Sequence, residues 1–113
     1  MKLHFFLLII ALFVGQSAWA QASKEEIQIQ TSAECDMCKE RIEKELIFTP
    51  GVKSAELNLE TKVVAITYKS SKITPEELRQ VIASVGYDAD EVKAQTEAYE
   101  SLPACCQKGG HDR

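Results

Sequence analysis

The chain has 113 residues, enough for one small domain, and its 17 acidic residues outnumber 13 basic residues to give a net charge of −4. Nucleic acids and anionic membranes bind proteins through basic faces, so this balance argues against both as partners. Four cysteines in so short a chain are the feature that points most directly to chemistry.

Residues 1–20 have the pattern of a cleavable signal peptide. Lys2 supplies a positive charge, residues 5–14 are an unbroken apolar run, and residues 18–20 read Ala-Trp-Ala, the small-x-small pattern of a cleavage site. The run is too short for a transmembrane helix, which needs about 20 residues. Removing 20 of the 113 residues leaves 93. We expect an exported protein that begins at Gln21 and is not stably inserted in the membrane.

The first half of the expected domain, residues 21–93, predicts a strand, a helix and a strand. Ile27 and Ile29 alternate with polar residues, the period of a half-buried strand. Apolar residues then recur every four positions from Cys38 to Leu46, which predicts a helix that Pro50 ends. Residues 54–60 alternate again and predict the second strand.

The second half predicts a strand, a helix and a last strand. Residues 63–68 alternate and follow residues 54–60 after a two-residue link, which predicts a β-hairpin. Thr74, Pro75 and Glu77 form a capping box at the start of the next helix. The weakest pattern is that of the final strand, at residues 87–92. The βαββαβ order predicts an α+β, ferredoxin-like fold with one antiparallel four-stranded sheet and two helices on one face.

The first cysteine pair, Cys35 and Cys38, is expected in the loop before the first helix and in its first turn. Backbone N–H groups and the helix dipole favour thiolates there, and two thiolates can clamp Cu(I), Zn(II) or a similar soft ion. A disulfide between them would close a tiny loop and stabilise the fold little. A thiol–disulfide oxidoreductase is the alternative function, although the tryptophan that usually precedes such a motif is missing.

Two stretches, "CDMCKERIEKELIFTPGVKSAELNLETKVVAITY" and "TPEELRQVIASVGYDA", resemble the heavy-metal-associated domain family over about residues 26–92. This family includes copper chaperones, the periplasmic mercury-binding protein and modules of metal-pumping ATPases. The resemblance implies that Cys35 and Cys38 are the metal ligands and that Tyr87 shields the metal loop. It also implies a periplasmic metallochaperone or scavenger. Its cargo would be one soft ion among Cu(I), Hg(II) and Zn(II) or Cd(II), and its partner a metal transporter or P-type ATPase.

Two departures from the family pattern surround the first cysteine. Ala33 stands where the family commonly has a methionine, and Glu34 could add a hard oxygen ligand that suits Zn(II). An enzyme is not expected, because no proton-transfer constellation is present in the sequence after residue 20. A monomer, or a dimer bridged by metal, is expected. An acidic module that docks on a transporter, with metal binding incidental, is a further alternative.

The tail, residues 94–113, lies outside the resemblance, and its polar composition predicts flexibility. Cys105, Cys106 and His111 are nevertheless soft-metal ligands by type. Two interpretations are open: thiols that oxidise with each other or with partners, or additional metal ligands. On the second interpretation the tail reaches the first cysteine loop and completes a site of three or four ligands.

Overall fold

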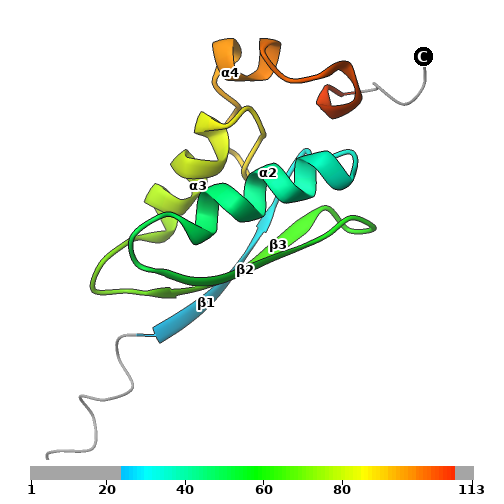
Figure 1. Cartoon of the computed structure of the whole chain (residues 1–113). Coiled ribbons are helices and arrows are strands. Elements are labelled where there is room, and N and C mark those ends of the chain that lie inside the picture. The colour runs from blue at the N-terminus through cyan, green and yellow to red at the C-terminus, as the bar shows by residue number, and fades with distance from the viewer. Residues whose placement is uncertain (1–23, 109–113) are drawn as a thin grey trace, which may run out of the picture.

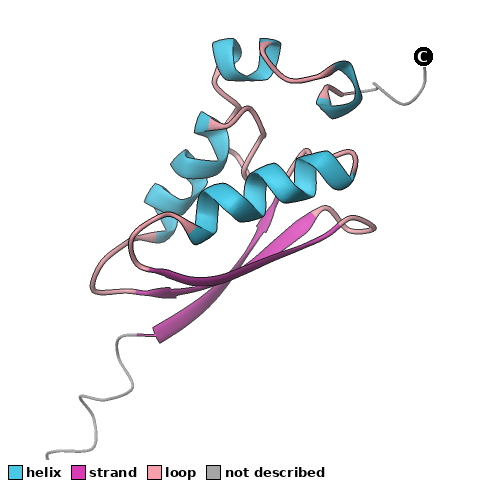
Figure 2. Ribbon diagram, viewed as in Figure 1, coloured by secondary structure: helices cyan, strands magenta, loops and turns pink. Residues whose placement is uncertain are grey.

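The protein folds as a layer of helices on one face of an antiparallel sheet (Figures 1 and 2). The computed structural model describes residues 24–108, so the expected signal peptide and His111 lie outside the described residues. The elements of the two layers are β1 (Lys24–Gln30), α2 (Asp36–Ile47), β2 (Val52–Asn58), β3 (Val63–Lys69) and α3 (Pro75–Ser84). The strands are arranged in the order β1-β3-β2. Both helices cover the same face, as the sequence predicted.

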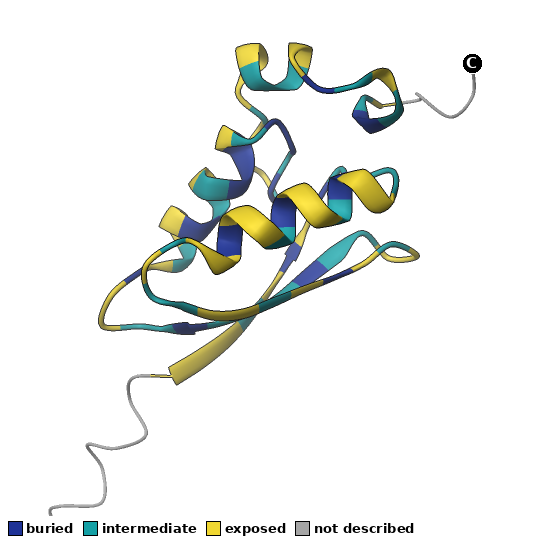
Figure 3. Cartoon of the chain, in the orientation of Figure 1, coloured by how far each residue is buried: buried dark blue, intermediate teal, exposed yellow. Residues whose placement is uncertain are grey.

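Each helix follows from local sequence. Along α2, Cys38, Ile42 and Leu46 are buried once per turn, while charged residues face solvent (Figure 3). At the start of α3, the Thr74 hydroxyl accepts a hydrogen bond from the backbone N–H of Glu77 at 3.2 Å, which confirms the predicted cap.

The central strand, β3, supplies much of the sheet's contribution to the core. Val64, Ile66 and Tyr68 alternate along it and are almost completely buried. Val64 lies opposite Ile29 of β1 and Leu57 of β2 in the antiparallel register. The predicted hairpin between β2 and β3 is therefore confirmed.

The predicted fourth strand, residues 87–92, does not form a strand in the described part of the chain, so the four-stranded sheet is not confirmed. Ala89 makes isolated bridges with Thr31 and Val92 only. Asp90 has a φ of +52°, in the left-handed region, which turns the chain away after one bridging residue. The Asp90 carboxylate also accepts a hydrogen bond from the backbone N–H of Gln30 at 2.9 Å. A side chain thus occupies the position that a strand's carbonyl would have.

The described part of the tail packs back on the helix layer through the short helix α4 (Thr96–Glu100) and the 3-10 turn η1 (Ala104–Cys106). Leu102, between them, is 6 % exposed. Gly86 permits the approach, because a Cβ there would lie 2.9 Å from the backbone oxygen of Ala98. The polar composition of the tail did not indicate these contacts. Within residues 24–108, no helix combines the length and apolar character needed to cross a bilayer.

Candidate metal centre

The first cysteine pair lies where the helix α2 begins. Cys35 is the N-cap residue, with extended backbone angles, and Cys38 is the third residue of the helix. Their Sγ atoms are 3.4 Å apart. The predicted placement of the pair at the loop and first helical turn is confirmed, and it sets the sulfurs close enough to bind one ion together.

The second pair lies directly against the first. The Cys106 Sγ atom is 3.8 Å from that of Cys35 and 4.0 Å from that of Cys105. The sulfurs of Cys35, Cys105 and Cys106 all lie within 4.8 Å of one another. All four cysteines are free thiols. The tail therefore reaches the cysteine loop, as it must if the tail cysteines are additional metal ligands. That they bind a metal ion stays a prediction.

Exposure differs across the four thiols. Cys38 and Cys106 are buried, whereas Cys35 and Cys105 are partly exposed. The thiol of Cys105 also donates to the sulfur of Met37 at 3.8 Å. Met37 is 45 % exposed, so this side of the cluster faces solvent. An ion on the loop pair would have a buried sulfur on one side and an accessible one on the other.

Cys38 has a thiol that ionises more readily than an ordinary cysteine. Burial alone would raise its pKa, but its interactions with the Cys106 thiol, the Tyr87 hydroxyl and the backbone of Glu34 bring the pKa below the usual value. Burial raises the pKa of Cys106, and its interaction with Cys38 acts in the same direction. Of these two neighbouring thiols, Cys38 therefore ionises more readily than Cys106.

Tyr87 is completely buried, with the thiols of Cys38 and Cys106 as neighbours of its hydroxyl. Burial raises the pKa of this hydroxyl far above its usual value, so it remains a donor. No hydrogen-bond partner of acceptable geometry reaches it among the described residues. Tyr87 lies next to the cysteine loop, where the family resemblance placed it; its shielding role stays a prediction.

The cysteine loop is held in place by Thr31, Ser32 and Ala33. Ala33 is completely buried, and its backbone N–H donates to the Thr31 hydroxyl at 3.2 Å. The Ser32 hydroxyl accepts a hydrogen bond from the backbone N–H of Asp88 at 2.9 Å. The Thr31 hydroxyl thus stabilises the loop internally, and the Ser32 hydroxyl fixes it against the segment after α3.

Glu34 is not part of the sulfur cluster in this structure. Its carboxylate lies 3.4 Å from the Nζ atom of Lys62 in a partly exposed ion pair. As a possible ligand Glu34 therefore stays a prediction, and so does His111, which lies outside the described residues.

Three residues that the sequence analysis did not select help to build the site. Met37 contacts Cys105, and Lys108 forms a 2.7 Å ion pair with Asp88 that holds the end of the tail. Charged residues in a polar tail are common, so spacing alone gave no signal for this pair. The position of Met37 between two cysteines was the only sequence feature that could have suggested its contact.

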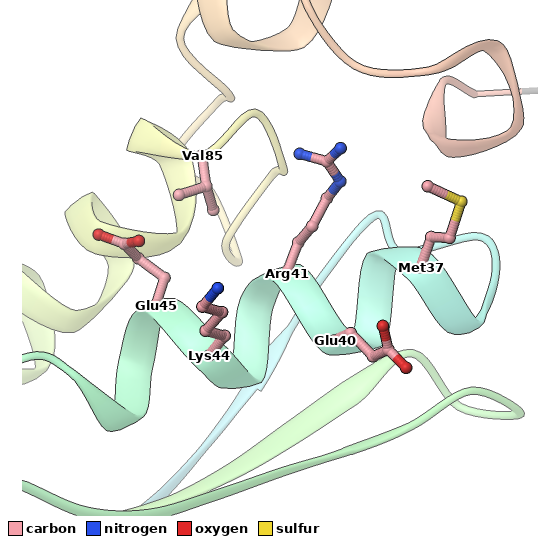
Figure 4. A pocket seen from close by; sticks show the side chains of 6 residues that line it. All are labelled: Met37, Glu40, Arg41, Lys44, Glu45 and Val85. Carbon is pink, nitrogen blue, oxygen red and sulfur yellow. The ribbon is translucent and has the colours of Figure 1, made fainter.

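A surface groove lies between α2 and Val85, the residue that follows α3 (Figure 4). Its lining residues are Met37, Glu40, Arg41, Lys44, Glu45 and Val85. Both signs of charge are present and no cluster of thiols or imidazoles occurs among these residues, so the groove lacks the ligands of a soft-metal site. The sulfur cluster remains the candidate centre.

The fold and the cysteine loop agree with comparisons against known proteins. A model of the heavy-metal-associated domain matches residues 32–88, half of the chain. This chain belongs to the heavy-metal-associated domain family. The matched residues contain Cys35, Cys38 and Tyr87 and end before the second cysteine pair, so the tail cysteines are an addition to the family domain.

Similar proteins share this domain. The copper chaperone CopZ of Staphylococcus epidermidis is 39% identical over 54 residues, which cover 48% of this chain and 79% of the relative. A probable copper-importing P-type ATPase A of Enterococcus hirae is 38% identical over 84 residues, 72% of this chain but 11% of the ATPase.

Solved structures agree on the fold. A structure described as CopZ metallochaperone has a TM-score of 0.56 and 30% identity, covering 57% of this chain and 98% of that one. Oxidised MerP from Ralstonia metallidurans CH34 has a TM-score of 0.58 and covers 60% of this chain and 96% of that one. At 19% identity MerP supports the fold alone.

Proposed function

We propose that this protein binds one soft metal ion through Cys35 and Cys38 and passes it on by ligand exchange, with Cu(I) as the first candidate. The observation that carries the proposal is the 3.4 Å approach of the two sulfurs at the start of α2, inside a heavy-metal-associated domain. Thiolate ligands select Cu(I) and other soft ions. The names of the relatives, which concern copper chaperones and copper ATPases, favour Cu(I) among these ions.

Transfer would proceed one ligand at a time. Cys35 is partly exposed and Cys38 is buried, so an incoming thiolate would replace Cys35 first. The ion would then be shared between Cys38 and the partner before Cys38 leaves. Such an exchange keeps the ion bound throughout, since each new sulfur–metal bond forms before the next one breaks.

The proposed partner is a copper-transporting P-type ATPase, because similar domains occur in proteins with that description. We further propose that the exchange takes place outside the cytoplasm, in the periplasm, since residues 1–20 have the pattern of a signal peptide. Fractionation of cells followed by mass spectrometry tests this location. Envelope material that begins at Gln21 would support it, and uncleaved protein in the cytosol would contradict it.

Competitive titration tests the metal. Reduced protein is titrated with Cu(I), Zn(II) and Hg(II) against chelators of known affinity, beside a variant that carries both Cys35→Ser and Cys38→Ser. We expect one tightly bound Cu(I) per chain and a loss of at least 100-fold in affinity in the double variant. Unchanged affinity in that variant would contradict the proposal.

The alternative of a thiol–disulfide oxidoreductase draws no support from the relatives, whose names concern copper. It predicts that the Cys35–Cys38 couple turns over an added disulfide substrate. An insulin-reduction assay with the same double variant as control distinguishes the two functions. A rate above the control would favour the alternative.

A further inference from the structure

We propose that Cys35, Cys105 and Cys106 form a second, three-thiolate site for the same soft ion, and that Cys35 belongs to both this site and the loop pair. The inference rests on the proposed function, because the cargo is the one that Cys35 and Cys38 bind. We name the three cysteines the tail triad. It makes the tail an intramolecular exchange partner for the loop pair.

The distances within the tail triad fit a three-coordinate ion. A metal–sulfur bond is about 2.3 Å, which places the sulfurs of a trigonal site about 4.0 Å apart. The measured separations are 3.8 Å between Cys35 and Cys106 and 4.0 Å between Cys106 and Cys105. The third separation is within 4.8 Å. A small rotation of one side chain would therefore complete the triangle.

The loop pair alone has a different geometry. A linear, two-coordinate ion needs its two sulfurs about 4.6 Å apart, twice the metal–sulfur bond length. The sulfurs of Cys35 and Cys38 are 3.4 Å apart, so a linear site would require the loop to open. A site with a third sulfur needs less movement, and the tail supplies one beside Cys35.

The tail is held in place by contacts that do not involve sulfur. Before the two tail cysteines in the chain, Leu102 is buried and packs beside Gly86. After them, the Lys108 ammonium pairs with Asp88. The backbone N–H of Lys108 also donates to the Tyr99 hydroxyl at 3.0 Å. The two tail cysteines therefore sit between two fixed points, which lowers the entropy cost of bringing them to the ion.

The buried hydroxyl of Tyr87 is a second, independent observation that points to a charged ligand set. It has no hydrogen-bond partner of acceptable geometry among residues 24–108, and its neighbours are the sulfurs of Cys38 and Cys106. Buried donors without partners are rare in folded proteins. A metal-bound thiolate is a strong acceptor, so loading the ion would satisfy this hydroxyl.

The exchange balances without a redox step. Starting from an ion on Cys35 and Cys38, the thiols of Cys105 and Cys106 bind as thiolates and release their protons to water. The Cys38–metal bond then breaks, and Cys38 either keeps its charge or takes up a proton. Cys35 stays bound throughout, and the oxidation state of the metal does not change.

The exchange has a direction in space. Cys38 is completely buried, whereas Cys105 is partly exposed beside the exposed Met37. Moving from the loop pair to the tail triad replaces the buried sulfur of Cys38 by the buried sulfur of Cys106 and adds the partly exposed sulfur of Cys105, so the ion gains an accessible ligand. A partner's thiolates could reach it there without opening the loop.

X-ray absorption of the protein loaded with one equivalent of Cu(I) tests the tail triad. We expect three sulfur ligands in the wild-type protein and two in a variant with Cys105→Ser and Cys106→Ser. In Cys38→Ser, the tail triad is intact, so one Cu(I) should remain bound with three sulfurs. Cys105→Ser alone changes a partly exposed residue, which guards against misfolding of the Cys106 variant, and it should also reduce the count to two. A count that stays at three in Cys105→Ser would assign the third sulfur to Cys106 beside the loop pair and would overturn the tail triad.

Several results would overturn the tail triad. These are two sulfurs in the wild-type protein, unchanged affinity and coordination after both tail substitutions, or loss of binding in Cys38→Ser. A third sulfur that comes from a bridged dimer, detected by doubled mass in native mass spectrometry, would do the same. The proposed function is tested separately by the Cys105→Ser/Cys106→Ser variant, which keeps only the loop pair. One Cu(I) bound there by two sulfurs supports metal binding by the loop, and loss of Cu(I) binding in that variant contradicts it.

Discussion

Asp88 connects the cysteine loop to the end of the tail. Its backbone N–H donates to the Ser32 hydroxyl at 2.9 Å, and its carboxylate lies 2.7 Å from the Lys108 ammonium. The same carboxylate accepts a hydrogen bond from the backbone N–H of Ala94, where the tail begins. One residue thus fixes the loop through its backbone and both ends of the described part of the tail, Ala94 and Lys108, through its side chain.

The Asp88–Lys108 pair predicts a pH dependence of tail docking. Burial would raise the pKa of Asp88, but the interactions with Lys108 and Ala94 bring it below its usual value. A lowered folded-state pKa means that the stabilisation is present above the unfolded pKa, about 3.9, and is lost as the pH falls through the folded pKa. Lys108 is 56% exposed, so the contribution should not exceed about 1 kcal/mol.

We expect Asp88→Asn to lower the free energy of unfolding at pH 7 by up to about 1 kcal/mol. Near pH 3 the free energies of unfolding of the variant and the wild-type protein should be closer. Urea unfolding at the two pH values measures the difference. Lys108→Gln is the complementary variant, and its effect should not add to that of Asp88→Asn. Equal differences at both pH values would show that the carboxylate charge has no part in the stabilisation.

Gly86→Ala should loosen the tail. Gly86 has a φ of +104°, and a Cβ would lie 2.9 Å from the Ala98 backbone oxygen. Gly51→Ala is a matched control, because Gly51 has a φ of +98° but a Cβ there would meet Ile73 instead of the tail. Backbone strain should lower the free energy of unfolding by about 1–3 kcal/mol in both variants.

Only Gly86→Ala should expose the tail to a protease that cleaves after glutamate. Mass spectrometry would detect early cleavage after Glu97 or Glu100 in α4. The same cleavage rate in both glycine variants would contradict a specific role of Gly86 in tail docking.

Tyr87→Phe should separate stability from metal affinity. Without metal, the variant removes a buried hydroxyl that lacks a partner, so the free energy of unfolding should stay unchanged or rise by up to about 1 kcal/mol. With Cu(I), loss of a hydrogen bond to a thiolate should weaken binding by about tenfold. Chelator competition and urea unfolding measure the two effects.

Tyr68→Phe is the control for Tyr87→Phe. Tyr68 is also buried, but its hydroxyl donates to the Glu25 carboxylate at 3.2 Å, away from the cysteines. That variant should lose some stability and keep its metal affinity. If Tyr68→Phe lost metal affinity and Tyr87→Phe did not, Tyr87 would have no role in the metal centre.

Glu34→Gln should leave the affinities for Cu(I) and Zn(II) unchanged within about twofold, because the Glu34 carboxylate lies beside Lys62 and is not part of the sulfur cluster. Asp36→Asn makes the same charge change on the other side of Cys35 and is the control. Chelator competition measures both ions. A tenfold loss of Zn(II) affinity in Glu34→Gln alone would instead identify the carboxylate as a metal ligand.

Local sequence signals were sufficient for most of the fold. The four-residue repeat of α2, the β2–β3 hairpin and the cap at Thr74 each depend on residues close in the chain, and the structure confirms them. The prediction of a last strand at residues 87–92 was wrong. These residues alternate between apolar and polar as a strand does, but the chain makes a left-handed turn at Asp90, which a contact with Gln30 stabilises. A period of two cannot report such a contact.

The candidate site was only partly predictable for the same reason. The motif identified Cys35 and Cys38, and residue type alone identified the tail cysteines as possible ligands. That Cys106 would lie beside Cys35 depends on Gly86, Leu102 and other contacts across the chain. Such contacts arise from packing between distant segments, which composition does not encode.

The order β1-β3-β2 makes β1 an edge strand of the sheet. Within the described residues, only the turn at Asp90 covers this edge, at the end of β1. An exposed edge strand can pair with a strand of another chain and so lead to aggregation. Lys24, Glu25 and Glu26 are exposed there. Their charges would oppose stacking of one molecule on another, so substitution of these three residues by apolar ones should make the protein prone to form fibres.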